Sequence, residues 1–285
     1  MPVPRSLRGL LLIRGLGHSG STILDLALGA HPALIGVGEA ARVLRKPAPG
    51  EERRGPARLR GDLRHERVCT CGVVAARCPV WGPLLDWVVA HEDLPLATKM
   101  LRLAEQIGSL PEGEGLAWLV DSYQGDLELP GQTLPGLETR VLFLVRDARS
   151  WVHSRRRDAA GPLAPLQTLA RWWRVNRRFE RELARSGKPV FVLGYEELAL
   201  APEAALRRLC GWLDLPFDGS MLTPGEASRS HVLSGNRMRF DPERRARIRY
   251  DGAWLASPGW TPRLIPLLPP VAAMHRRLVY GNRLL

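Results

Sequence analysis

A glycine-rich turn near the start of the chain carries the residue types of an anion-binding loop. Residues 15–22 read GLGHSGST; an apolar run at 10–13 precedes them, and apolar residues at helical spacing follow as far as Gly29. Main-chain N–H groups of such a turn, with the positive end of the helix dipole, favour a bound phosphate or sulfate. The alternative is a turn that only packs a helix against a sheet.

The spacing of this turn follows the phosphate-loop frame G-x-x-x-x-G-K-[ST], with Ser21 in place of the lysine. Nucleoside triphosphatases use that lysine on the β- and γ-phosphates. Its absence argues against hydrolysis of ATP or GTP but leaves binding of a nucleotide 5′-phosphate open. The turn therefore suits a nucleotide that needs no clamp on a γ-phosphate.

A second candidate anion site follows a later apolar run. Arg146 closes the run at 140–145, and Ser154 lies eight residues further on, in an expected helix. A guanidinium fork and a hydroxyl in these places can converge on one phosphate. The alternatives are a surface ion pair between Arg146 and Asp147, or a helix that Asp147 caps.

Strand and helix patterns alternate along the chain. We expect strands at 10–13, 116–120, 140–145 and 189–193, and helices at 23–28, 84–89, 101–107, 151–157, 165–185 and 202–213. This alternation predicts an α/β protein with the three-layer fold of the P-loop type, a central parallel sheet flanked by helices. Ligands bind such sheets at the carboxyl ends of the strands, where the glycine turn, Asp121, Arg146 and Tyr195 fall.

Size and composition suit a globular enzyme. The 285 residues fit one domain over 1–285, and a hydrophobic content of 45% can fill a core. The formal charge of +12 carries little weight, because arginine far outnumbers lysine, as a GC-rich genome alone would produce. We expect no membrane span and a cytoplasmic location. Residues 45–67, rich in Pro, Gly, Arg and Glu, are expected to form a loop or lid.

A cysteine-containing insert is expected at 69–81. Cys69, Cys71 and Cys78 lie within CTCGVVAARCPVW. They could be three zinc ligands if His65 or Cys210 completed the site, or a disulfide or reactive thiol pair. We favour a compact turn with small buried thiols and predict no metal site.

Together the two anion motifs resemble those of the sulfotransferases that use 3′-phosphoadenylyl sulfate (PAPS). GLGHSGST resembles their 5′-phosphosulfate loop, and RDARSWVHS resembles their 3′-phosphate motif. The resemblance is greatest to bacterial sulfotransferases and tyrosylprotein sulfotransferases. It extends to GAHPALIGVGEAARVL, the CTCG and CPVW pieces, YEEL and HVLSGNRMRF, from about residue 10 to about residue 255.

The resemblance implies how PAPS would bind. Arg146 and Ser154 would hold the 3′-phosphate, Tyr195 would lie near the adenine, and Arg237 or Arg239 would close over the cofactor. The 5′-phosphate would be held by the amides and hydroxyls of Gly17, His18, Ser19, Gly20, Ser21 and Thr22. The reaction would be in-line transfer of the sulfuryl group to an acceptor hydroxyl, leaving adenosine 3′,5′-bisphosphate (PAP), with no metal required.

The resemblance also implies catalytic residues. Glu39 matches the base of the tyrosylprotein group, although it could instead be a glutamate favoured by a helix N-terminus. His18 stands where many relatives have lysine or arginine; the cationic role could fall to a protonated His18, to Arg14 or to another arginine. Gln124, in DSYQ, replaces the lysine of a bacterial DSSK element, and Asp121 could act in acid–base chemistry or cap the next segment.

Two other classes of function stay open. A kinase-like phosphotransferase would need a metal-binding acid after a strand, which Asp121 could supply, but the loop lysine is lacking. A non-catalytic nucleotide or nucleic-acid binder could stack bases on Trp172 and Trp173, in RWWRVNRR. We expect no nucleic-acid partner; the acceptor could be a small molecule, a glycan, a lipid or a peptide, and the oligomeric state is open.

Overall fold

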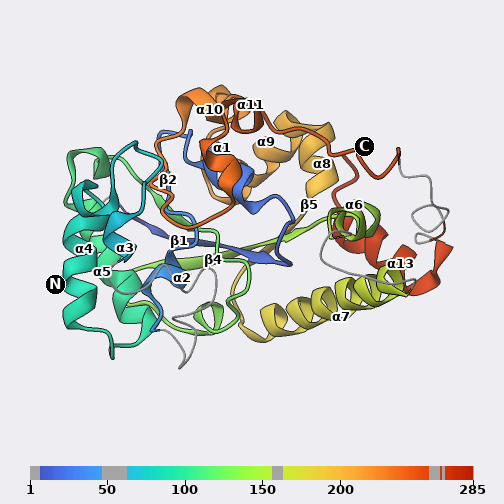
Figure 1. The fold of residues 1–285 in the computed structure, drawn as a ribbon, viewed down its shortest axis with the longest axis horizontal. Coiled ribbons are helices and arrows are strands. Elements are labelled where there is room, and N and C mark those ends of the chain that lie inside the picture. Colours follow the sequence, from blue (N-terminus) through green and yellow to red (C-terminus); the bar gives the residue numbers. More distant parts are fainter. Residues whose placement is uncertain (1–6, 47–62, 156–162, 257–263, 265–266, 285) are drawn as a thin grey trace.

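A five-stranded parallel sheet forms the centre of the protein (Figure 1). The computed structural model describes residues 7–46, 63–155, 163–256, 264 and 267–284. The strands are β1 (Gly9–Gly15), β2 (Leu34–Gly36), β3 (Trp118–Asp121), β4 (Glu138–Val145) and β5 (Val190–Gly194), and their order across the sheet is β2-β3-β1-β4-β5. The predicted α/β fold with a parallel sheet is confirmed.

Helices cover both faces of the sheet, because each strand carries apolar residues on both sides. Along β1, Leu10 and Leu12 belong to the core of one face, while Leu11 and Ile13 belong to the other. The second core also contains α1 (Ser21–Leu28), α8 (Tyr195–Leu200) and α9 (Pro202–Trp212). In Figure 1 these three helices lie above the sheet and the long α7 (Ala164–Arg185) lies below it.

The first core is built from the helices on the α7 side. They are α2 (Ala40–Leu44), α4 (Trp81–Ala90), α5 (Leu96–Gly108), α6 (Ala148–Ser154), α7 and α13 (Pro269–Met274). Three further helices are short: α3 (Leu63–Glu66), α10 (Pro224–Ala227) and α11 (Pro242–Ala246). The 3₁₀ turns include η3 (Ala75–Arg77), η4 (Pro111–Gly113), η5 (Leu129–Gly131), η7 (Gly219–Leu222) and η8 (Arg237–Phe240). A π-helical turn, η10 (His275–Val279), continues α13.

Strand register brings three predicted site segments together. Gly15 of β1 lies opposite Leu144 of β4, and Val145 of β4 lies opposite Gly194 of β5. The glycine turn, Arg146 and Tyr195 therefore leave the sheet side by side at its carboxyl edge.

Several helices and strands differ from those expected from the sequence. Strand β2 was not predicted, and residues 195–197, shortly after the expected strand at 189–193, begin α8. Helix α6 begins at Ala148, where Asp147 caps it by accepting from the amide of Arg149. Of the expected loop at 45–67, residues 63–66 form α3, and 47–62 lie outside the described residues.

Trp172 is a core residue and not a platform for bases. Its side chain is fully buried, and its indole N–H donates to the carbonyl oxygen of Arg146 over 2.9 Å. None of the helices in the described ranges is long and apolar enough to cross a membrane.

Candidate nucleotide-binding site

The turn between β1 and α1 needs glycine at two points. Gly15 (φ +149°) and Gly20 (φ +94°) both have positive φ. A Cβ on Gly15 would lie 2.3 Å from the carbonyl oxygen of Leu144, and one on Gly20 would lie 2.3 Å from the ring of Tyr195. Glycine therefore lets the turn pass closely over the ends of β4 and β5.

This turn presents main-chain donors and hydroxyl groups. The N–H groups of Gly17, Ser19, Gly20, Ser21 and Thr22 have no acceptor among the described residues. Ser21 Oγ accepts from the Gln124 side chain, and Thr22 Oγ1 accepts from the amide of Asn236 over 3.3 Å. Because both hydroxyls accept, their protons can be donated to an anion at the N-terminus of α1.

A cavity of about 1510 Å³ opens beside this turn. Its lining includes Glu39, Arg146, Tyr195 and much of the segment 234–251. Eight arginines line the cavity but only three carboxylates do. The cavity therefore suits a ligand with several negative charges.

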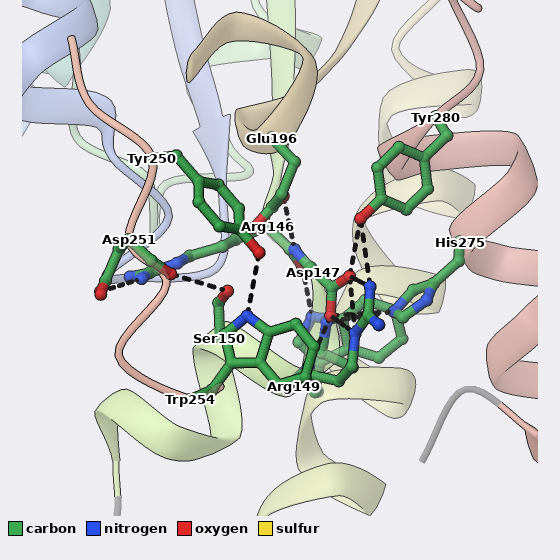
Figure 2. Close-up of polar contacts among 12 residues, drawn as sticks. Arg146, Asp147, Arg149, Ser150, Glu196, Tyr250, Asp251, Trp254, His275 and Tyr280 are labelled. Atoms are coloured by element: carbon green, nitrogen blue, oxygen red, sulfur yellow. Dashed lines mark hydrogen bonds and ion pairs between the residues drawn. The ribbon is translucent and has the colours of Figure 1, made fainter. Parts of the chain in front are cut away.

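Arg146 lies at the edge of the cavity, against the glycine turn. Its Nη1 donates to the carbonyl oxygen of His18 over 3.0 Å, and its Nη2 pairs with Asp251 (Figure 2). The guanidinium carbon lies 5.4 Å from the centre of the Tyr195 ring, whose hydroxyl donates to the carbonyl of Arg249. The structure therefore brings the predicted anion-binding arginine and the glycine turn into contact.

A buried network around Asp147 fixes the start of α6 (Figure 2). Its carboxylate accepts from Arg149 and from the Tyr280 hydroxyl, while its amide donates to Glu196 over 2.8 Å. Burial raises the pKa of Asp147, but Arg149 and His275 together hold it below the ordinary value. Burial raises the pKa of Glu196 to about 7. This network holds the residue after Arg146 in place.

His18 contacts a cation that sequence reasoning missed. Its backbone is left-handed (φ 70°), and Arg155 Nη1 lies 2.8 Å from its Nε2. Since a guanidinium only donates, Nε2 is the accepting nitrogen. Trp151 adds a second link between α6 and the turn, donating from its indole to the Gly17 carbonyl over 2.8 Å. The arginine run after Ser154 was the signal in the sequence, but it did not reveal this contact.

Glu39 is the N-cap residue of α2 and lines the cavity. Its Oε2 accepts from Arg42 over 2.7 Å and from the Ser234 hydroxyl over 3.0 Å. The preceding residue, Gly38, has φ +65°, and a Cβ on it would lie 2.5 Å from the Ser234 carbonyl oxygen. Glycine therefore lets the backbone before Glu39 pass close to Ser234. Oε1 has no partner among the described residues, so it can accept a proton from a ligand.

Burial excludes Arg14 as the cation of the site and Asp121 as its acid–base group. Arg14 is fully buried and pairs with Asp121 (2.7 Å) and Asp126 (2.8 Å), so it cannot serve as a cation in the cavity. Asp121 also accepts from the amide of Ala41 at the start of α2. Burial raises the pKa of Asp121, and its role is to pair with Arg14 and cap α2.

Arg237 and Arg239 both line the cavity but differ in environment. Arg237 is exposed, whereas Arg239 is buried. The guanidinium of Arg239 donates to the carbonyls of Leu233, Gly235 and Asn236, and burial lowers its pKa. Arg239 therefore holds its own loop together, whereas the Arg237 side chain is exposed at the cavity.

Ser154 is exposed at the end of α6, and its hydroxyl donates to the Trp151 carbonyl over 2.7 Å. It is not among the described residues that line the cavity, although its neighbour Arg155 contacts His18. The structure thus brings Arg146 to the glycine turn more closely than it brings Ser154.

A parallel sheet with an anion-binding turn after its middle strand, beside an arginine-lined cavity, defines a nucleotide-binding α/β protein. The model of the sulfotransferase family matches residues 11–219, and the chain belongs to this family of PAPS-dependent enzymes.

One solved structure supports the fold. The sulfotransferase domain from the curacin biosynthetic pathway is similar, with a TM-score of 0.51 and 18% identity over 92% of this chain and 97% of that one. The sulfotransferase domain from the Synechococcus PCC 7002 olefin synthase aligns over 93% of this chain and 89% of its own, at 17% identity and a TM-score of 0.43. No curated protein matches the chain.

The residues at the cavity fit PAPS. The amides of Gly17 and of residues 19–22 suit one anionic end, and the Arg146 guanidinium, whose Nε is buried without a partner among the described residues, suits another. The excess of arginines over carboxylates matches the charge of a doubly phosphorylated nucleotide.

Proposed function

We propose that this protein transfers the sulfuryl group of PAPS to an acceptor hydroxyl by in-line displacement, acting as one domain over residues 1–285. The observation that carries the proposal is the contact between two anion sites. The amides of the glycine turn and the guanidinium of Arg146 border the same cavity, and Arg146 touches the turn at His18.

The turn would hold the 5′ end of the nucleotide, and Arg146 with Ser154 its 3′-phosphate. The 5′ group would accept from main-chain N–H groups and from the hydroxyls of Ser21 and Thr22. Tyr195, whose ring lies over Gly20 and beside Arg146, would contact the adenosine. Arg237, which lines the cavity, would close over the nucleotide.

When bound, PAPS supplies the sulfuryl group, and PAP is the product. Transfers of this kind have loose transition states, so the protein contributes positioning and charge stabilisation. Glu39, with Oε2 held by Arg42 and Ser234, would accept the proton of the acceptor hydroxyl at Oε1. His18, backed by Arg155, would stabilise charge on the departing group. No metal is needed for this step, because the nucleotide is a good leaving group.

A kinase-like function is disfavoured by Asp121. That function needs an accessible acid for the metal, and Asp121 is fully buried and paired with Arg14. Magnesium-dependent turnover of ATP by the purified protein would support the kinase-like function instead.

Calorimetry with PAP tests the cofactor site directly. We expect saturable binding near one PAP per chain, with adenosine 5′-phosphate bound more weakly. Absence of PAP binding by the folded wild-type protein would overturn the proposal. A screen of phenolic, aliphatic, glycan and peptide hydroxyls with ³⁵S-labelled PAPS then defines the acceptor class.

A further inference from the structure

Three cysteines and one histidine come together outside the lining of the nucleotide cavity. The Sγ atoms of Cys69, Cys71 and Cys78 and a ring nitrogen of His231 all lie within 4.8 Å of one another. Cys69 and Cys78 are buried, His231 is half-buried, and Cys71 is exposed. These four residues are the Cys₃His cluster.

The distances in the cluster match a tetrahedral zinc site. With Zn–S bonds of about 2.3 Å and a Zn–N bond of about 2.0 Å, neighbouring ligand atoms lie roughly 3.5–3.8 Å apart. The Cys78 sulfur lies 3.7 Å from that of Cys71, 3.9 Å from that of Cys69 and 3.2 Å from His231 Nδ1. Cys69 Sγ lies 3.9 Å from the same nitrogen. Four donors around one centre, with softness that zinc prefers, satisfy the ligand count of a closed structural site.

Local backbone structure presents the three sulfurs to one point. Cys69 and Cys71 lie on a tight turn, in which the Cys69 amide donates to the Val73 carbonyl over 2.9 Å and Gly72 has φ +91°. Cys78 lies just before α4, and its carbonyl accepts from the amide of Gly82. The three cysteine side chains thus bring the turn at 69–73 next to the start of α4.

His231 reaches the cluster from a distant part of the chain and is held there by its main chain. The Thr70 hydroxyl bonds the Ser230 carbonyl and accepts from the Val232 amide, and the Trp81 indole donates to the His231 carbonyl over 2.7 Å. The histidine is therefore fixed against both halves of the cysteine insert.

The fourth ligand differs from both candidates that the sequence offered. His65 Nε2 lies 3.0 Å from an oxygen of Asp86. Cys210 is buried in the core on the other face of the sheet, 3.6 Å from the sulfur of Met221. The expectation of a compact turn with buried thiols described only part of this arrangement, because the histidine is 153 residues from Cys78.

We propose that Cys69, Cys71, Cys78 and His231 bind one structural Zn²⁺ ion. Four protein ligands leave no open position for water, so the ion would not take part in catalysis. The site would tie the insert at 69–81 to the segment that carries Ser234, Asn236 and Arg237 to the cavity. It does not rest on the proposed sulfotransferase chemistry, because its evidence lies outside the nucleotide cavity.

The test is the metal content of the full chain, purified under reducing conditions from zinc-supplemented cells. We expect about one zinc per chain by plasma mass spectrometry and three sulfur and one nitrogen neighbours by X-ray absorption. After chelation, added Co²⁺ should give the absorption bands of tetrahedral thiolate coordination, and removal of zinc should lower the unfolding temperature.

Substitutions then identify the ligands. His231→Ala should weaken zinc binding by more than about a hundredfold, whereas His231→Cys should keep the ion in a four-sulfur site. His65→Ala and Cys210→Ser are matched controls and should leave zinc content unchanged. If His231→Ala does not fold, the X-ray absorption of His231→Cys decides the fourth ligand: four sulfur neighbours assign it to residue 231, and an unchanged set of three sulfurs and one nitrogen would contradict the assignment.

The proposal is overturned if the reduced wild-type protein carries no stoichiometric zinc and shows no tetrahedral Co²⁺ spectrum. It is equally overturned if mass spectrometry finds two of the three cysteines joined in a disulfide in protein from the cytoplasm. Loss of zinc from the His65 or Cys210 control, with retention in His231→Ala, would also contradict it.

Discussion

Arg146 and Asp251 form an ion pair at the edge of the cavity, with Nη2 of the arginine 2.5 Å from Oδ2 of the aspartate. The aspartate occupies one edge of the guanidinium that we propose for the 3′-phosphate (Figure 2). The Asp251 side chain is 47% exposed, so the pair is worth at most about 1 kcal/mol. Replacing it with asparagine should therefore tighten PAP binding by roughly two- to fivefold, which calorimetry measures.

Glu243→Gln is the matched control for Asp251→Asn. Glu243 lines the same cavity but does not contact Arg146 among the described residues, and its replacement removes the same charge. An equal gain in PAP affinity from both variants would show that only the net charge of the cavity matters.

Arg146→Ala should weaken binding of the 3′-phosphate end of the nucleotide far more than binding of its 5′ end. Charge-assisted hydrogen bonds contribute about 1.5–3 kcal/mol each, so we expect PAP to bind roughly 10- to 100-fold more weakly. Adenosine 5′-phosphate lacks the 3′-phosphate and should lose far less affinity. Ser154→Ala should show the same selectivity on a smaller scale, because a neutral hydroxyl contributes less than a guanidinium. Equal losses for both ligands would place the 3′-phosphate elsewhere.

Local sequence patterns predicted most of the sheet, the glycine turn and Arg146. They did not predict the long-range contacts that Arg146 and the cysteines make with the segment at 231–251. Apolar runs and the glycine turn located β1 and β4, and Arg146 was found because it directly follows an apolar strand. By contrast, β2 has only three residues, too few for a periodic pattern. Asp251 and His231 lie in a segment without apolar periodicity, and their partners are about 100 or more residues away. Contacts of this kind arise from tertiary packing, which spacing alone does not encode.

Glu39→Gln should keep PAP binding and lower sulfuryl transfer by about a hundredfold or more, because the amide cannot accept the proton of the acceptor. Ser234→Ala removes one hydrogen bond to Oε2 but leaves the carboxylate, so its loss of rate should be much smaller. The measurement is single-turnover transfer to the best acceptor with saturating labelled PAPS. Unchanged turnover in Glu39→Gln would remove this residue as the base.

Arg237 and Arg239 should respond differently to the same substitution. Arg237→Ala should weaken PAP binding by roughly tenfold and change stability by less than about 0.5 kcal/mol. Arg239→Ala deletes the donors to three main-chain carbonyls and should destabilise the protein by roughly 1–3 kcal/mol. Calorimetry and urea unfolding check the two variants side by side. The opposite pattern, with Arg239→Ala stable and defective in binding, would assign the cofactor contact to Arg239.

Asp25 should make stability depend on pH. This residue of α1 is fully buried, and burial raises the pKa of its carboxyl to about 7, from an ordinary value of 3.8. Between these pH values the folded protein keeps a proton that the unfolded chain releases, so the free energy of unfolding falls as pH rises through this window. The loss should approach about 4 kcal/mol near pH 7 and stay constant above it.

Asp25→Asn removes that titration and keeps an oxygen for the Gly38 amide, which donates to Asp25 over 3.1 Å, next to Glu39. Relative to wild type, this variant should therefore gain stability steadily from about pH 4 to pH 7 and gain no more at pH 8. Urea unfolding of both proteins at several pH values checks this. Taking the difference cancels other titrating groups, including Glu196, whose pKa burial raises to about 7. Parallel curves for the two proteins would mean that Asp25 does not carry a proton in the folded state.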